Sequence, residues 1–264
     1  MKKISSLLIL VTLLNCIYTQ EAKKELTLED AVMGYYKGLY PKNMYGLSWT
    51  DNNQLYIREN NNINIYSNFS PNKKKTISIT KDIIKNTDQK RIRNFKYQNT
   101  NSYSYSSGNN YTYKYAKKET TIILPQKAAN QLASPNNEAI AYTIDNNLFF
   151  ANSKDSIIEI TNHKDKNIVS GQSIHRNEFG ITNGIFWSNN SEQIAFYQKD
   201  ETDVHNYPLL NINNTPGELN SIKYPMAGQK SEYAKVGVYN LIDKSITYLF
   251  TEQEKDDYLT NLTW

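Results

Sequence analysis

One strand–turn–strand phrase recurs along this chain, and it constrains the fold more than any other feature. Each copy has a small or aromatic residue at the end of one strand, then a polar turn, then a second strand. The copies recur at roughly 40 to 55 residues without helical periodicity between them, which is the spacing of four-stranded propeller blades. They lie at 45–58, 132–142 and 186–197, and a further one begins at 262–264.

A tyrosine-rich stretch, residues 97–124, predicts a weaker copy of the same unit. Its tyrosines alternate with other residues on both sides of a Gly108-Asn109 turn, which is the period-two pattern of a β-hairpin. We therefore predict an all-β fold, a partial β-propeller of about four blades with four strands each. A β-sandwich is the alternative, because its strands have similar turns.

Smaller patterns make local predictions. Thr27 is followed three residues later by Asp30, which predicts a capping box at the start of a short helix. Trp187, Phe186 and Phe196 are predicted to form core between blades, and Asp200 is predicted to cap a turn at a blade edge.

The first twenty residues predict an export signal. Lys2 and Lys3 precede an apolar run at residues 4–14, which is shorter than the ~20 residues of a membrane span. Cys16, the only cysteine, is either acylated as in a bacterial lipoprotein or removed with the signal. We expect an exported protein of the periplasm or cell envelope, with a signal peptide at 1–20 and an incomplete propeller at 21–264.

Charge excludes one class of partner. The formal charge is +4 over 264 residues, and both signs are interspersed. A balance this weak gives no reason to expect a nucleic-acid partner.

The catalytic motifs of hydrolases and metalloenzymes are missing from the sequence. It holds no Gly-x-Ser-x-Gly, the strained turn that exposes a hydrolase serine. The three histidines, His163, His175 and His205, show no metal-ligand spacing. We expect no catalytic residue, metal or cofactor here, and a chain that is inactive by itself.

Residues 171–228 carry a resemblance to a known family. Their order resembles the N-terminal β-propeller of the dipeptidyl peptidase IV family, in the prolyl oligopeptidase clan of serine peptidases. Within that family the bacterial prolyl tripeptidyl aminopeptidases are the most similar, and a weaker likeness extends over 26–264. The matching residues are His175-Arg176-Asn177-Glu178-Phe179-Gly180-Ile181, Phe186-Trp187-Ser188, Ala195-Phe196-Tyr197, Asp200, Tyr207-Pro208 and Tyr224-Pro225-Met226-Ala227-Gly228.

The resemblance implies an eight-bladed propeller followed by an α/β-hydrolase domain. It therefore predicts that this chain is the front part of a longer polypeptide, from a truncated or split gene, with open strand edges. Family members often form homodimers through the hydrolase domain and a propeller extension.

The resemblance also implies a substrate-binding site. A glutamate at the place of Glu178 binds the free α-ammonium of a peptide by a charge-assisted hydrogen bond. Arg176 would orient Glu178 or contact a substrate carbonyl. A surface salt bridge for Glu178 and a solvent-facing Arg176 are the alternatives. The single glutamate, and the lack of arginine in 97–115, favour the tripeptidyl branch.

These observations give one leading hypothesis for function. The chain is the substrate-gating and N-terminus-anchoring part of an exported serine exopeptidase that cuts after proline, and a separate hydrolase domain performs the chemistry. A non-catalytic propeller binding module and a truncated remnant are the alternatives.

Overall fold

A computed structural model of the chain describes residues 25–41, 44, 46–50, 52–66, 72, 74–84, 92–152, 157–249 and 258–264. The predicted signal peptide at 1–20, with Cys16, lies outside these residues. Within them, no helix combines the length and apolar character that crossing a membrane requires.

Three four-stranded antiparallel sheets form the first three blades, each with strands paired in chain order. The first blade holds β1 (Leu47–Trp49), β2 (Leu55–Glu59), β3 (Asn62–Tyr66) and β4 (Lys74–Ser78). The second holds β5 (Arg93–Asn99), β6 (Ser102–Ser107), β7 (Asn110–Tyr115) and β8 (Lys118–Ile123). The third holds β9 (Ala129–Ala133), β10 (Ala139–Ile144), β11 (Asn147–Asn152) and β12 (Ile158–Glu159).

The fourth blade has a divided first strand. Both β13 (Ile168–Ser170) and β14 (Ile185–Trp187) pair with β15 (Gln193–Asp200), which pairs in turn with β18 (Tyr233–Asn240), and β18 pairs with β19 (Ile246–Leu249). The chain leaves the sheet between β13 and β14 and forms the turn η2 (His175–Gly180). A separate hairpin, β16 (Asn206–Asn211) with β17 (Glu218–Lys223), links β15 to β18.

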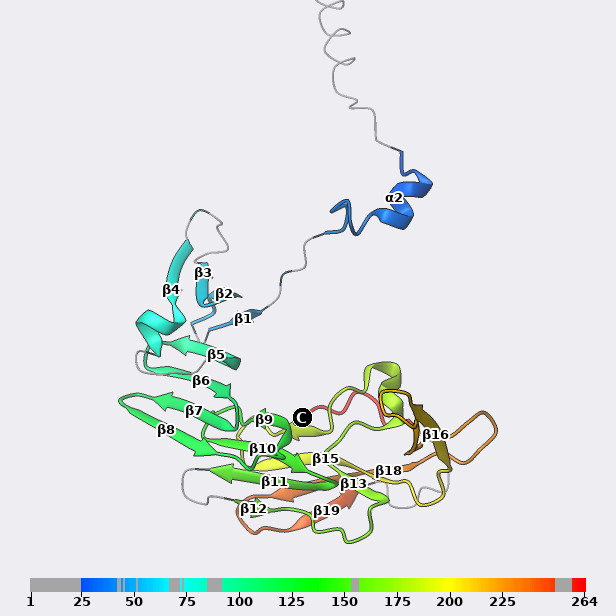
Figure 1. Ribbon diagram of the computed structural model, residues 1–264. Coiled ribbons are helices and arrows are strands. Elements are labelled where there is room, and N and C mark those ends of the chain that lie inside the picture. The colour runs from blue at the N-terminus through cyan, green and yellow to red at the C-terminus, as the bar shows by residue number, and fades with distance from the viewer. Residues whose placement is uncertain are drawn as a thin grey trace, which may run out of the picture.

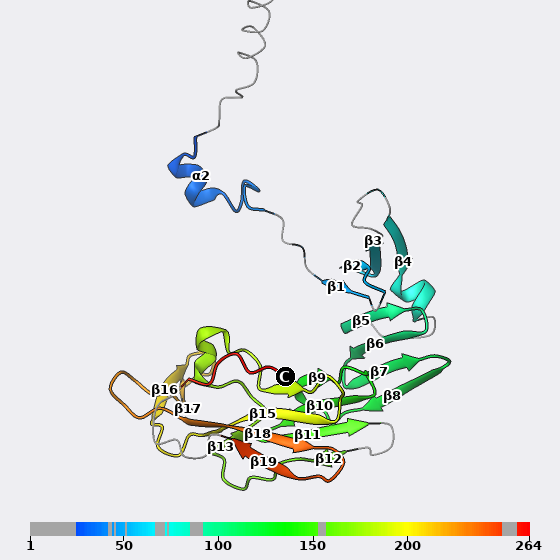
Figure 2. The same ribbon diagram turned by 180° about the vertical axis from the view of Figure 1, so that it is seen from behind.

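The four blades follow one another along an open arc (Figure 1), and the view from behind shows the same order (Figure 2). In both views the yellow-green η2 and the red C-terminal residues lie on the side of the arc where β9 lies. The predicted partial propeller of about four blades is confirmed, because the chain forms successive antiparallel sheets, three of them paired strictly in chain order and the fourth interrupted by the β16–β17 hairpin. The strands do not form two facing layers, which excludes the β-sandwich.

A repeated hydroxyl explains the recurring phrase. Ser134 Oγ accepts from the Ala139 backbone N–H at 3.0 Å, and Ser188 Oγ accepts from that of Gln193 at 2.9 Å. In the first blade, Thr50 Oγ1 accepts from the Gln54 N–H at 3.1 Å. Each hydroxyl satisfies a backbone donor at the turn that joins the first two strands of a blade, so small hydroxyl residues recur there.

Tryptophans join successive blades. The buried Trp187 donates from its indole Nε1 to the Leu132 carbonyl of the third blade at 3.0 Å. Trp264 repeats this contact one unit later, donating to the Phe186 carbonyl at 3.1 Å. Phe196 is fully buried and Phe186 is half-buried against Tyr197, so the predicted core positions are confirmed.

The other local predictions also hold. The helix α2 (Leu28–Met33) begins with the predicted capping box, because Thr27 and Asp30 each accept the other's backbone N–H. Asp200 Oδ1 accepts from the Thr202 N–H at 2.8 Å and so caps the turn after β15.

Candidate functional site

The turn η2 has a backbone that ordinary residues avoid. His175, Arg176 and Asn177 have φ of 50°, 55° and 62°, and Phe179 has 51°. Only Glu178, at φ −64° and ψ 157°, is extended. Left-handed conformations cost L-residues about 1 to 2 kcal/mol each. A run of them is retained only where the surroundings hold it, and such runs cluster at functional sites.

A buried carboxylate holds the start of this turn. The His175 backbone N–H donates to Glu232 Oε1 at 2.5 Å, and Glu232 is 2% exposed. Lys199 Nζ lies 3.9 Å from Glu232 Oε2 and 2.9 Å from Glu201 Oε1. The lysine therefore offsets part of the charge that Glu232 and Glu201 bring into the fold.

Arg176 is directed away from Glu178. Its guanidinium donates to the Lys223 carbonyl at the end of β17, and it lies 5.1 Å from the ring centroid of Tyr224. Arg176 thus ties η2 to the hairpin β16–β17. Among the ion pairs between described residues none joins Arg176 to Glu178, so the surface salt bridge between them is not formed.

Glu178 is exposed and meets the C-terminal segment. The Tyr258 hydroxyl donates to Glu178 Oε2 at 2.8 Å. The Tyr258 ring lies 4.6 Å from the His175 ring and 5.0 Å from the Phe179 ring. Phe179 itself is 74% exposed, so it flanks the carboxylate without enclosing it. Substrate binding by Glu178 and Arg176 stays a prediction.

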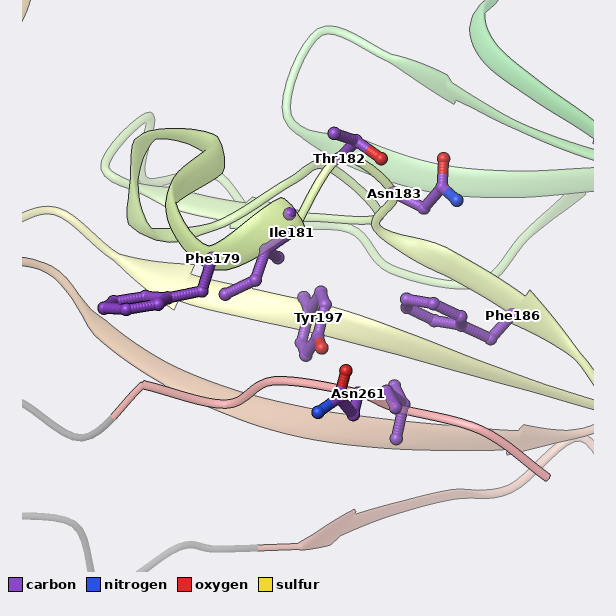
Figure 3. A pocket seen from close by; sticks show the side chains of 9 residues that line it. Phe179, Ile181, Thr182, Asn183, Phe186, Tyr197 and Asn261 are labelled. Atoms are coloured by element: carbon purple, nitrogen blue, oxygen red, sulfur yellow. The ribbon is translucent and has the colours of Figure 1, made fainter. Parts of the chain in front are cut away.

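A hollow of about 150 Å³ lies beside the turn. Figure 3 shows Phe179, Ile181, Tyr197 and Phe186 along it, with Asn261 on the facing C-terminal segment. The Tyr197 hydroxyl donates to the Leu259 carbonyl at 2.8 Å, and burial raises the pKa of Tyr197. Among the described residues that line it, the hollow therefore presents aromatic faces and carboxamides and no charged side chain. Glu178 adjoins the hollow through its neighbour in the chain, Phe179.

The histidines take structural places. His163 Nε2 lies 3.0 Å from Ser170 Oγ and His175 packs on Tyr258, whereas His205 is exposed. Among the described residues no group of three or more His, Cys, Asp or Glu side chains could hold a metal ion.

Sequence reasoning missed Glu232 and Tyr258 in this site. Each lies more than fifty residues from its partner in η2, at separations of 57 and 80. No short motif joins them to the turn. A carboxylate just before a buried strand, as Glu232 is before β18, was the one local signal.

Comparisons with known proteins agree on the family. The model of the dipeptidyl peptidase IV (DPP IV) N-terminal region matches residues 87–264. A crystal structure of a putative dipeptidyl aminopeptidase IV from Bacteroides ovatus ATCC 8483 is 31% identical, with a TM-score of 0.68, over 85% of this chain and 32% of that one. Porphyromonas gingivalis dipeptidyl peptidase 4 shares the fold at 20% identity and a TM-score of 0.62, over 89% of this chain and 36% of that one.

This chain therefore spans about a third of the length of the solved proteins it matches. The family match covers well over half of the present chain, from the second blade to Trp264. The chain belongs to the dipeptidyl peptidase IV N-terminal region family.

Proposed function

We propose that this chain is the propeller part of an exported serine exopeptidase, where it gates the substrate and anchors its free N-terminus. Glu178 binds the α-ammonium group, and a separate α/β-hydrolase domain supplies the catalytic residues. The observation that carries the proposal is the strained turn η2, which is held from three sides and presents one exposed carboxylate beside a hollow.

Physical chemistry supports the role of Glu178. An α-ammonium distinguishes a peptide end from mid-chain peptide, and a carboxylate reads it by a charge-assisted hydrogen bond. Tyr258 already donates to one oxygen of this carboxylate, Oε2. A carboxylate has about four acceptor positions, so Tyr258 can orient the group while an ammonium binds the other oxygen. Arg176 acts on this site through the backbone, because its guanidinium is committed to Lys223 and Tyr224.

We propose cleavage after proline and a tripeptidyl preference. One glutamate stands in the turn, and no arginine lies in 97–115. The two solved relatives carry dipeptidyl names, so peptides of both lengths belong in any assay.

Binding to the chain itself tests the N-terminal anchor. Isothermal titration would compare Ala-Pro and Ala-Ala-Pro peptides with a free or an acetylated amine. We expect acetylation, or Glu178→Gln, to weaken binding about tenfold, the loss of one charge-assisted hydrogen bond of about 1.5 kcal/mol. Glu159→Gln on the exposed outer strand β12 is the matched control. Equal affinity for free and acetylated peptides would refute the anchor.

We also propose that the hairpin β16–β17 packs against a second copy of the chain. It exposes Leu210 by 63%, Ile212 by 79% and Leu219 by 72%, and two strands alone bury too little to justify such apolar exposure. Sedimentation of the chain should show a dimer that Leu210→Lys dissociates. A wild-type monomer at every concentration would exclude this interface in the chain.

A further inference from the structure

Three hollows follow one another and share lining residues, and we name this series of hollows the carboxamide track. The hollow beside η2 shares Thr182 and Asn183 with a second hollow of about 120 Å³. The second shares Asn130 and Gln131 with a third of about 420 Å³. The track therefore leads from Phe179 to the third hollow through shared lining residues.

The track crosses the first strands of three neighbouring blades. It begins at β14 of the fourth blade, passes β9 of the third, and ends at Arg93 and Asn94 at the start of β5 in the second. Figure 1 shows β5, β9 and η2 in this succession along the arc. A ligand in the track would thus contact several blades at once.

The lining suits a peptide backbone. Carboxamide side chains recur along the track, and a carboxamide has both donor and acceptor groups for a peptide backbone. Asn130 Nδ2 already donates to Thr143 Oγ1 and Gln131 Nε2 to the Ala128 carbonyl, which leaves their oxygens and second N–H groups for a ligand. Among the described residues that line the third hollow none is aromatic, so these residues offer no stacking platform for a sugar ring or a nucleobase. The carboxamides are Asn94, Asn109, Gln126, Asn130, Gln131, Asn183 and Asn261.

A carboxylate adjoins one end of the track in the chain, and a guanidinium lines the other end. Glu178 immediately precedes Phe179, which lines the near end. Arg93 is the only charged residue among the described residues that line the far end, and its side chain is exposed. A guanidinium binds a carboxylate by two parallel hydrogen bonds. Among the described residues that line the three hollows there is no carboxylate.

We propose that the carboxamide track binds short peptides at both ends, with the ammonium at Glu178 and a carboxylate at Arg93. The Glu178 end rests on the proposed function, whereas the Arg93 end rests on the track alone. The carboxylate is supplied by the peptide C-terminus or by an acidic side chain.

Titration of the chain with a peptide series tests both ends. Peptides of three to eight residues, beginning Ala-Ala-Pro, would be compared as free acids, C-terminal amides and N-acetyl forms. For the peptide length that binds most tightly, we expect C-terminal amidation to weaken binding about fivefold to tenfold. An amidated peptide with one aspartate would distinguish the two sources of the carboxylate. It recovers affinity only if an acidic side chain can bind Arg93 in place of the peptide C-terminus.

The Arg93→Gln variant should bind the free-acid and the amidated peptide with equal affinity. The losses of affinity caused by the substitution and by amidation should therefore not add. Lys127→Gln is the matched control, since Lys127 is a 73% exposed cation close to this hollow that pairs with Asp145 on the surface. If both Arg93→Gln and Lys127→Gln lose the preference for the free acid over the amide, the preference is a general charge effect and the proposal is overturned. Circular dichroism of Arg93→Gln and Arg93→Lys confirms that each variant is folded.

The outcomes separate this inference from the proposed function. One outcome is that acetylation weakens binding while neither C-terminal amidation nor removal of an acidic side chain weakens it. In that case the Arg93 end is wrong and the Glu178 anchor stands. If amidation matters and acetylation does not, the Glu178 anchor is wrong and the Arg93 end stands. If neither matters, both are wrong.

Discussion

The backbone N–H of His175 donates a 2.5 Å hydrogen bond to the carboxylate of Glu232. This contact joins the first left-handed residue of η2 to the residue before β18. Since β18 pairs with β15 along its whole length, the position of the strained turn is fixed to the most extensive pairing of the fourth blade. The geometry at Glu178 therefore depends on a carboxylate that no substrate would touch.

Removal of the Glu232 carboxylate should loosen this turn. We expect Glu232→Ala to lower the free energy of unfolding by about 1 to 3 kcal/mol, because the His175 N–H is left buried without an acceptor. Lys199 keeps Glu201 as its nearer partner, which limits the loss. Urea denaturation measures the change. Glu232→Gln retains an acceptor oxygen and should recover most of it.

Peptide binding distinguishes positioning from stability alone. Affinity for a free-amine peptide should fall in Glu232→Ala and return in Glu232→Gln, at a temperature where both variants are folded. Asp203→Asn is the control, since it removes an exposed pair with Lys230 and should leave the urea midpoint and affinity nearly unchanged. Unchanged affinity in Glu232→Ala would refute a positioning role.

The second prediction concerns the contact between the third and fourth blades. Trp187→Phe removes the indole N–H that reaches the Leu132 carbonyl at 3.0 Å and leaves a gap where part of the ring was. We expect a loss of about 1 to 3 kcal/mol in the free energy of unfolding. Trp264→Phe removes the equivalent bond from a side chain that is 45% exposed, and it should cost less. A larger loss for Trp264→Phe would contradict this account.

The repeating parts of the fold could be predicted from the sequence. The recurring strand–turn–strand pattern around Thr50, Ser134 and Ser188 comes from a turn whose hydroxyl residue lies next to its two strands in the chain. The same residue types therefore recur in the sequence of each of these blades. The same holds for the Gly108-Asn109 hairpin between β6 and β7. Local hydrogen bonds leave a local pattern.

The site could be predicted only in part. The motif around Glu178 coincides with the strained turn η2. The direction of Arg176 depends on Lys223 and Tyr224, at the end of the β16–β17 hairpin. Tyr258 reaches the turn through the tertiary fold alone. Contacts of this kind join residues far apart in the chain and leave no periodicity to read.

The third prediction is a loss of stability in mild acid. His163 Nε2 lies 2.8 Å from Gln198 Nε2 and 3.0 Å from Ser170 Oγ. An amide nitrogen is a donor only, so this contact favours the neutral imidazole. Burial first, and the charge of Lys235 second, lower the pKa of His163 below its ordinary value of 6.5. The unfolded chain then binds more protons as pH falls through 6.5, so stability is present above this pH and is lost below it.

His163→Gln should remove this pH dependence while its carboxamide retains an acceptor. Urea midpoints of wild type and variant, measured from pH 8 down to pH 5, should therefore draw together or cross as the pH falls below 6.5. His205→Gln is the control, because His205 is exposed and its replacement should leave the wild-type pH profile in place. Parallel profiles for wild type and His163→Gln would contradict this prediction.

The fourth prediction concerns Gly237, which pairs with Phe196 across β15 and β18. A Cβ at position 237 would collide with the Phe196 ring, and Phe196 is fully buried. We expect Gly237→Ala to lower the free energy of unfolding by about 1 to 3 kcal/mol through overpacking. The penalty should shrink in a Phe196→Leu background, which a double-mutant cycle measures. Gly108→Ala, at φ +54° with open space around the added Cβ, should carry the same penalty in both backgrounds, because its cost is backbone strain. Equal penalties for Gly237→Ala in the two backgrounds would mean that the aromatic ring is not what selects glycine there.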